Sequence, residues 1–418
     1  MKLLQLKAKD FRSLKDLEIN FPDEQVIAII GNNGSGKTAV LDALYMSLTQ
    51  VIAFRAIDKL YIISEDDKAS EFAEVELTFY NNHQVVKSKL GNKSSSNVIS
   101  SISKIGGLRA YTYYASQRSY EEDVKSIEDF SKDEELHKFI RSLGFKISKL
   151  VGRDFNDWFI AESQRENEEV KNRKDFSFTL DSLNNIRTAI NIFFANLEDE
   201  RFGNILVKTQ KNTNILDFRN IPKPEIYIQK DIFELKLSQL SAGEKMLIYL
   251  VADLAKRLTI LHTNKENALN KEHLVLIDEL DLNLHPSWQK SVVKALSATF
   301  PNIQFVITTH SPLILNQLKT ESILLMEDGK CTPLSEKYQS FNSYGADLED
   351  ILKIVQGTEN LLPKDIQQKL DEINAKLNEG AIEDAKDLIE KLKKLTDPNQ
   401  PELKKAETQI QYKELLKK

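Results

Sequence analysis

The sequence has almost no cysteine and no long apolar run. Cys331 is the one cysteine in 418 residues, which excludes a disulfide framework and a cysteine-ligated metal site. No apolar stretch approaches the roughly 18 residues of a membrane-spanning helix. The first residues, Met1 to Lys7, alternate apolar and charged side chains, which is typical of a strand and not of a signal peptide. We therefore expect a cytoplasmic protein.

The chain also has little excess charge of either sign. A net charge of −6 argues against a uniformly basic nucleic-acid-binding surface. The apolar content of 41% is that of an ordinary globular protein. The length allows two or three domains with a sizeable core.

The strongest motif is the stretch Gly31 to Thr38, GNNGSGKT, which fits the phosphate-loop pattern G-x-x-x-x-G-K-[ST] without a mismatch. The apolar run Val26 to Ile30 before it predicts a buried strand, and the residues from Ala39 predict a helix. This order directs backbone N–H groups and the positive end of a helix at phosphate oxygens. We expect Lys37 to reach the β- and γ-phosphates of a nucleoside triphosphate and Thr38 to bind Mg²⁺. The other expected loop contacts are Asn33, Gly34, Ser35 and Gly36.

Further strands flank this motif. Period-two alternation predicts strands at residues 3–9, 17–21 and 73–80, which suggests a small antiparallel sheet beside a parallel core. A compact strand over residues 109–114 ends shortly before Gln117.

Residues 121 to 222 differ in character, since glutamate, lysine and helical periodicity dominate there. They predict a helical insertion, with helices near Phe130–Leu143, Trp158–Glu169 and Leu183–Leu197. The insertion lacks sustained heptads, so a long coiled-coil arm is not expected. Strands are predicted again at residues 226–228 and 233–237.

The remaining motifs follow in close order. Leu240–Lys245 opens an apolar helix, and residues 274–279 and 305–310 predict two buried strands joined by a crossover helix over 286–300. Strands that alternate with helices imply a parallel sheet with a site at the carboxyl ends of its strands. The first of these strands ends in Asp278, where a phosphate-loop NTPase needs its Mg²⁺-holding acid. Glu279 is expected on the opposite face, because side chains alternate along a strand, and to polarise the attacking water.

With these motifs the chain resembles the ABC-type ATPase class, which includes SMC, RecF and transporter nucleotide-binding domains. The resemblance implies an ABC-type P-loop ATPase head, an α/β fold with a mixed central sheet and an antiparallel subsheet. It implies that Gln117 is the lid glutamine and an Mg²⁺ ligand, that Asp281 lies in the D-loop, and that His310 is the catalytic switch histidine beside Glu279. It also implies that Ser241 and Gly243 clamp ATP held by a second protomer, so that the site is complete only in a head-to-tail dimer.

Plainer readings stay open for several of these residues. Ser241 to Glu244 also fits an ordinary helix N-cap. His310, ahead of Ser311 and Pro312, also fits a simple strand end. His285 has no cysteine or second histidine at ligand spacing, so we favour a loop role near a dimer interface over a metal site.

The chain is further similar to the PtuA-type ATPases of Septu and Septu-like retron anti-phage systems. The resemblance rests on residues 280–289, 301–305 and 308–312, and on landmarks at 157–159, 166–168, 344–347 and 351–352. It implies an ATPase subunit that forms homodimers or larger homo-oligomers and regulates a separately encoded nuclease, such as the HNH protein PtuB. DNA, or a retron RNA–DNA with its reverse transcriptase, is a further possible partner. One departure is Asn283, where the family usually carries histidine.

Polar helices are predicted after Gly357. Apolar stripes over residues 366–377 and 382–392, separated by the turn at Gly380, predict an αα-hairpin followed by a helix over 402–416. The stripes could pack within their own domain or bind a partner helix. The predicted parts of the chain are thus an N-terminal ATPase lobe (1–120), the insertion (121–222), a C-terminal ATPase lobe (223–357) and a helical tail (358–418).

Two other functions compete with a defence ATPase. A RecF-like DNA-repair ATPase would bind duplex directly, through basic residues such as Lys208, Lys211, Arg219 and Lys223, although so loose a scatter is more typical of a solvated face. A transporter motor is the weakest alternative, because the chain carries a helical tail and no membrane segment. The chain after His310 shows no clustered acidic motif of a TOPRIM nuclease.

Overall fold

The computed structural model describes residues 1–57, 68, 73–81, 84–91, 111–115, 146–147, 151–209, 223–262, 267–357 and 362–415. The chain divides into two compact units, Met1–Leu348 and Glu349–Lys418, each described by itself. The division into four parts made from the sequence stays a prediction. No helix in the described ranges is long and apolar enough to cross a membrane.

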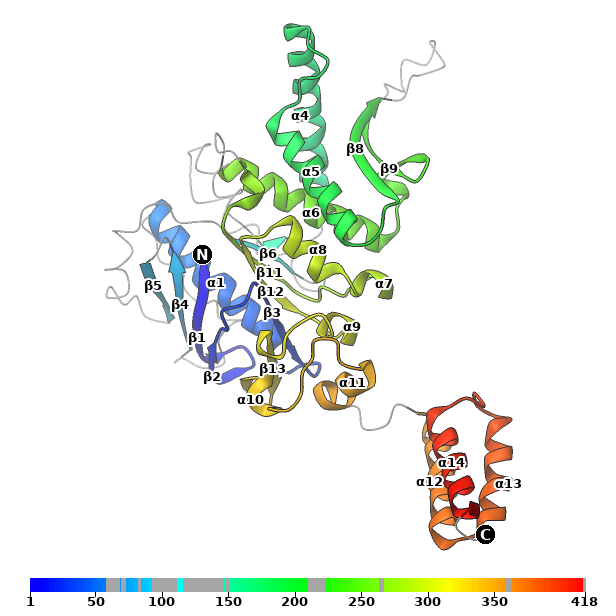
Figure 1. Ribbon diagram of the computed structural model, residues 1–418. Helices are drawn as coiled ribbons and strands as arrows, with labels where there is room; N and C mark the ends of the chain where they lie inside the picture. Colours follow the sequence, from blue (N-terminus) through cyan, green and yellow to red (C-terminus); the bar gives the residue numbers. More distant parts are fainter. Residues whose placement is uncertain are drawn as a thin grey trace. The chain divides into compact units, whose positions relative to one another are not determined.

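A seven-stranded sheet forms the centre of the first unit (Figure 1), with the strand order β14-β13-β3-β12-β11-β6-β7. All neighbours in it are parallel except β13 and β14. The predicted parallel core is therefore confirmed, and it brings the carboxyl ends of strands from both halves of the chain to one edge. Its strands are β3 (Val26–Gly31), β6 (Tyr111–Tyr114), β7 (Lys146–Ile147), β11 (His273–Ile277), β12 (Ile303–Thr308), β13 (Ile323–Glu327) and β14 (Lys330–Pro333).

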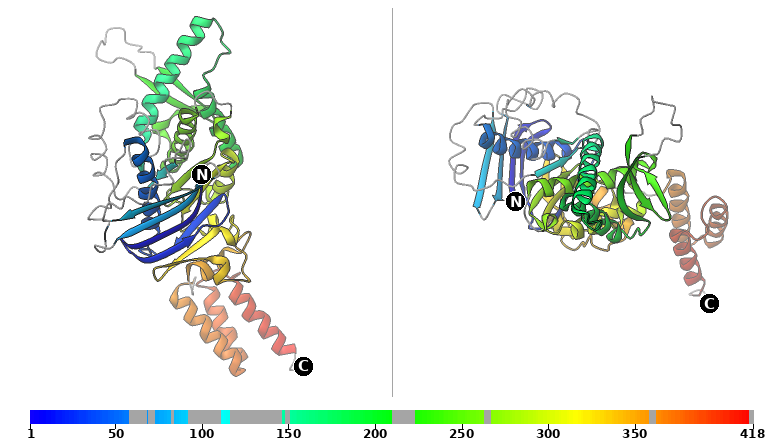
Figure 2. Two further views of the ribbon diagram at one scale, coloured as in Figure 1. Left: turned by 90° about the vertical axis from the view of Figure 1, so that its left-hand side faces the viewer. Right: turned by 90° about the horizontal axis from the view of Figure 1, so that it is seen from above.

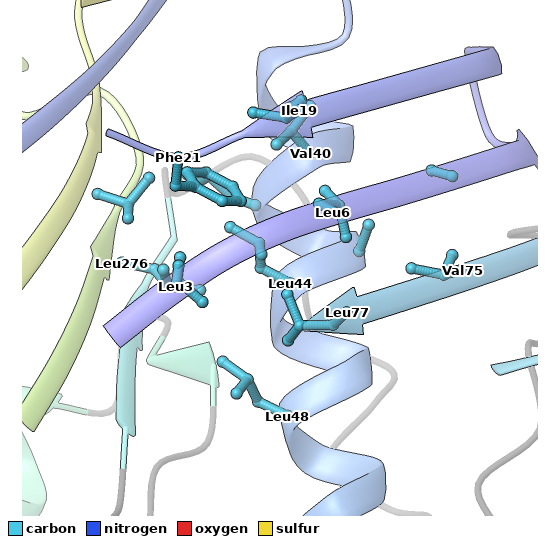
Figure 3. Packing of buried hydrophobic residues seen from close by; sticks show 14 of the residues in the cluster. Leu3, Leu6, Ile19, Phe21, Val40, Leu44, Leu48, Val75, Leu77 and Leu276 are labelled. Carbon is cyan, nitrogen blue, oxygen red and sulfur yellow. The ribbon is translucent and has the colours of Figure 1, made fainter. Parts of the chain in front are cut away.

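An antiparallel sheet of order β2-β1-β4-β5 lies beside it, as predicted, and its strands lie side by side in the blue part of Figure 2. One face of this sheet is apolar and covers α1 (Lys37–Ile57), the helix that begins in the phosphate loop. Leu44 of α1 points toward Leu6 and Leu77 of the sheet (Figure 3), and all three are fully buried. This packing fixes the helix on which the loop depends. The strands are β1 (Lys2–Phe11), β2 (Leu14–Asn20), β4 (Glu74–Asn81) and β5 (Gln84–Gly91).

The insertion contains two of its predicted helices, α4 (Val151–Arg173) and α5 (Asp181–Asn196). The helix predicted near Phe130–Leu143 lies outside the described residues. Six apolar residues of α5 are buried, and the helix packs on α6 (Ala242–Leu261) and α8 (Val292–Thr299). The range predicted as a helical insertion also contains a strand that was not predicted, β8 (Phe202–Thr209), which pairs with β9 (Pro224–Lys230). A three-stranded antiparallel sheet, β10-β9-β8, results, with β10 at Phe233–Lys236.

The predicted crossover helix over 286–300 is two helices. α7 (Pro286–Gln289) ends at Lys290, and α8 begins after Ser291, whose φ of −133° is not helical. The break lets Trp288 of α7 turn into the protein, where its indole Nε1 donates to Asp199 at 3.0 Å.

The second unit holds α11 (Leu348–Gln356) from Glu349 onward and contains a three-helix bundle of α12 (Lys364–Glu379), α13 (Ile382–Lys393) and α14 (Pro401–Leu415). Gly380 ends α12 with a φ of 80°, as the predicted turn requires. Both apolar stripes meet α14 in one buried core that includes Ile373, Ile389 and Ile410. The stripes therefore pack within their own unit and are not open for a partner helix.

Candidate nucleotide site

The phosphate loop connects β3 to α1 as the sequence predicts. Lys37 is 8% exposed, and its Nζ donates to the carbonyl oxygens of Gly31 (2.9 Å) and Asn32 (3.0 Å). Burial lowers the pKa of Lys37, while the carboxylates of Asp278, Glu279 and Asp281 act in the opposite direction. The lysine is thus held at the loop, near the acids that follow β11.

The loop has the features of a phosphate cradle. Gly36 has a φ of 103°, a conformation that strains any residue with a side chain, and a Cβ added there would lie 2.9 Å from Leu14 Cδ2. The Ser35 hydroxyl is buried and finds no hydrogen-bond partner among the described residues. A buried hydroxyl without a partner is costly unless a ligand satisfies it. Asn33 and Gly34 lie exposed at the tip of the loop. These residues fit a bound triphosphate.

Hydrogen bonds from two hydroxyls to one carboxylate join the phosphate loop to the ends of β11 and β12. Thr38 Oγ1 donates to Asp278, 3.1 Å from Oδ2, and Thr308 Oγ1 donates to Asp278 Oδ1 at 2.6 Å. A carboxylate and a hydroxyl are the oxygen ligands that Mg²⁺ takes from a protein alongside substrate phosphates. No group of three or more acidic, histidine or cysteine side chains in the described ranges is arranged to hold a metal ion by itself. Thr38 and Asp278 are the described residues that would hold the ion beside the phosphates. When bound, Mg²⁺ would neutralise charge that develops on the phosphates.

The direction of the Glu279 side chain has a different cause from the one predicted. β11 ends at Ile277, and Glu279 has a φ of 52°, in the left-handed region. Its direction is therefore set by a turn of the backbone and not by the alternation of a strand, which corrects the sequence argument. The Glu279 N–H donates to Thr308 Oγ1 at 2.7 Å, which holds this strained residue. Its side chain remains partly exposed, as a carboxylate that activates water must be.

The predicted D-loop and switch residues also meet. Asp281 Oδ1 accepts from Thr309 Oγ1 (2.6 Å) and from the His310 backbone N–H (3.2 Å). This contact joins the end of β12 to the loop after β11, and it leaves the His310 side chain exposed. The roles of Thr308 and Thr309 were not predicted, although the Thr-Thr-His end of β12 is a visible signal for them.

The signature residues lie at the start of α6. Ser241 is the N-cap, and it forms a capping box with Glu244: the Ser241 N–H donates to Glu244 Oε2 at 2.8 Å, and the Glu244 N–H donates to Ser241 Oγ at 3.4 Å. The N-cap reading is thus correct. It leaves Ser241 and Ala242 exposed at the positive end of a 20-residue helix, which suits an anion.

Gly243 is required by close packing. A Cβ there would lie 2.3 Å from the carbonyl oxygen of Asn283, just inside the D-loop. Asn283 has a φ of 61°, a conformation that asparagine adopts more readily than most residues. The signature motif and the D-loop are thus in direct backbone contact. No hydrogen bond in the described part of the chain joins Ser241 or Gly243 to the phosphate loop.

The other predicted residues take no described part in the nucleotide site. Gln117, Lys211 and Arg219 lie outside the described residues. His285 caps α7 and forms a 2.7 Å hydrogen bond with Ser287, and it belongs to no metal-binding group among the described residues. Lys208 forms an ion pair with Glu234, so it adds no net charge to a basic groove. Lys223 is exposed.

Comparison with known proteins identifies the family. The profile of the RecF/RecN/SMC N-terminal domain matches residues 2–332. The chain belongs to this family. It is an ATPase with an SMC-type α/β head.

Individual relatives agree with the narrower resemblance. A retron Vc95 probable ATPase of Vibrio cholerae is 26% identical, over 87% of this chain and 80% of that protein. The Septu protein PtuA of Bacillus thuringiensis is 23% identical over 97% of both chains. The similarity to PtuA-type ATPases predicted from the motifs is therefore confirmed. Among solved structures, an SMC head bound to the C-winged helix domain of ScpA aligns with a TM-score of 0.43 and 18% identity, over 79% of this chain and 97% of that one.

Proposed function

We propose that this chain is the ATPase subunit of an anti-phage defence complex, in which two copies close head-to-tail around ATP and so regulate a separately encoded nuclease. The observation that carries the proposal is the division of the nucleotide machinery. Lys37, Thr38 and Asp278 lie together, whereas Ser241 is the exposed N-cap of α6, where Glu244 closes the capping box and Gly243 packs on Asn283. A second copy would supply that helix end to the ATP.

The residues define the steps of hydrolysis in such a dimer. The phosphate loop binds the β- and γ-phosphates, with Gln117 expected at the lid and at the ion. Glu279 accepts a proton from the attacking water, and His310 faces the γ-phosphate from the neighbouring strand. Because the Thr308 hydroxyl contacts both Asp278 and the Glu279 N–H, the acid that holds the ion and the acid that activates water are fixed relative to each other.

The link to defence rests on the retron ATPase and PtuA relatives. The partner is proposed as an HNH nuclease of the PtuB kind, in a complex that acts in the cytoplasm. The test is affinity purification of the tagged chain, expressed with its neighbouring genes, followed by mass spectrometry. Recovery of a nuclease in stoichiometric amount supports the proposal, and recovery of the chain alone contradicts it.

Direct action on DNA, as in a RecF-like repair ATPase, has weaker support, because Lys208 is neutralised by Glu234. The same purified chain decides this point. Duplex binding that weakens steeply with salt would favour the repair function, and we expect no such binding.

A further inference from the structure

Glu244 creates an electrostatic conflict at the N-terminal end of α6, residues Ser241 to Glu244, which we call the signature end. It lies in the first turn of the helix, where the positive end of the dipole stabilises a carboxylate. The same carboxylate opposes the approach of a phosphate to this end. A helix that is to receive ATP from a second copy therefore needs this charge balanced.

Lys230 balances it. This last residue of β9 places Nζ 2.6 Å from Glu244 Oε1, with side-chain exposures of 22% for Lys230 and 10% for Glu244. A pair this sheltered is screened by salt less than a surface pair. The nearby Arg201 guanidinium is already bound to Asp199, at 2.7 and 2.6 Å.

The charge state of Glu244 agrees with this geometry. Burial acts to raise the pKa of Glu244, but the hydrogen bonds from Lys230 and Ser241 outweigh it, and the pKa lies below its ordinary value. Glu244 is therefore ionised at neutral pH. Its second oxygen holds the Ser241 N–H, so the ion pair also fixes the N-cap.

We propose that Lys230 is a positioning residue for ATP-dependent assembly: it holds Glu244 in the interior and cancels its charge, which leaves the exposed Ser241 end of α6 able to accept the γ-phosphate of ATP bound to a second copy. This inference rests on the proposed function. It adds a residue of β9, outside every motif found in the sequence.

The experiment measures ATP-dependent dimerisation by sedimentation in a Glu279→Gln background, with Mg²⁺, and the binding of a fluorescent ATP analogue. Lys230→Met should weaken dimerisation about tenfold or more and leave analogue binding within about twofold, because the phosphate loop is untouched. Lys230→Arg should retain dimerisation. The matched control is Lys236→Met, which breaks the 2.5 Å pair with Glu225 on the same small sheet and should change neither quantity.

A double variant separates charge from packing. If Lys230 acts by cancelling Glu244, Lys230→Met combined with Glu244→Gln should restore most of the dimerisation, since glutamine keeps the capping box. The inference is overturned if Lys230→Met dimerises as the reference does, or if the double variant is no better than Lys230→Met. If the Glu279→Gln reference itself stays monomeric with ATP bound, the proposed function fails as well.

Discussion

The phosphate-loop end and the signature end of this ATPase differ in what surrounds their polar groups. At the loop, Lys37 and Asp278 are buried: Lys37 donates to carbonyl oxygens of the loop itself, and Asp278 accepts from Thr38, which is distant in the chain. At the signature end, Ser241 and Ala242 are exposed. The Glu244 N–H donates to Ser241, and Gly243 packs on the carbonyl of Asn283. In the proposed dimer, the phosphate-loop end binds the nucleotide, and the signature end meets the nucleotide that a second copy binds.

The largest expected effect comes from removing the charge at the loop. Lys37→Ala should abolish measurable ATP binding, a loss of about 100-fold or more, because it removes a sheltered cation from the triphosphate. Isothermal titration with ATP and Mg²⁺ measures it. Lys15→Ala, an exposed lysine of β2, is the control and should bind normally. Retained binding in Lys37→Ala would contradict the assignment of the loop.

Acid should destabilise the sheet that carries the site, because His273 at the start of β11 takes up a proton on unfolding. This residue is buried, bonds to Thr112 at 2.9 Å, and burial lowers its pKa to about 3. Since the unfolded chain binds a proton near pH 6.5 and the folded chain does not, stability is full above pH 6.5 and falls as the pH drops toward 3. Each pKa unit corresponds to about 1.4 kcal/mol, so the loss is of the order of several kcal/mol.

Denaturant unfolding between pH 7 and pH 4 measures this loss. His273→Gln, which lacks a titrating group, should show a shallower dependence on pH over the same range. Equal slopes for the two proteins would show that His273 does not carry the effect.

A smaller effect is expected at the signature end. Gly243→Ala forces its Cβ toward the Asn283 carbonyl, so it should reduce kcat about tenfold or more while ATP binding changes by no more than about twofold. Gly203→Ala is the control, because its nearest neighbour is the movable Gln229 side chain at 3.1 Å. Should both variants hydrolyse ATP as the native protein does, the contact between the signature motif and the D-loop has no role in turnover.

The sequence predicted the phosphate-loop end well because its signals are local. Loop, strand and helix follow one another within the chain, and apolar runs mark β3, β11 and β12. The direction of Glu279 escaped prediction because a left-handed residue ends the alternation on which the argument relied. β8 was missed since its register shifts between Phe202 and Ile205, which interrupts the period of a strand.

The signature end was predicted only in part for a related reason. The Ser241–Glu244 spacing is a visible capping box, but the partner of Glu244 lies on β9, an element whose position depends on how the small sheet folds. The contact of Gly243 with Asn283 is likewise a contact between distant segments. Such pairs follow from tertiary packing, which no local pattern specifies.

The central claim is that the signature end completes the nucleotide site of another copy. The most direct measurement is the mass in solution of the Glu279→Gln protein, by light scattering after size exclusion, with and without ATP and Mg²⁺. We predict one chain without ATP and two with it, and no change in a Glu279→Gln, Lys37→Ala double variant. A single-chain mass with ATP bound would contradict the account.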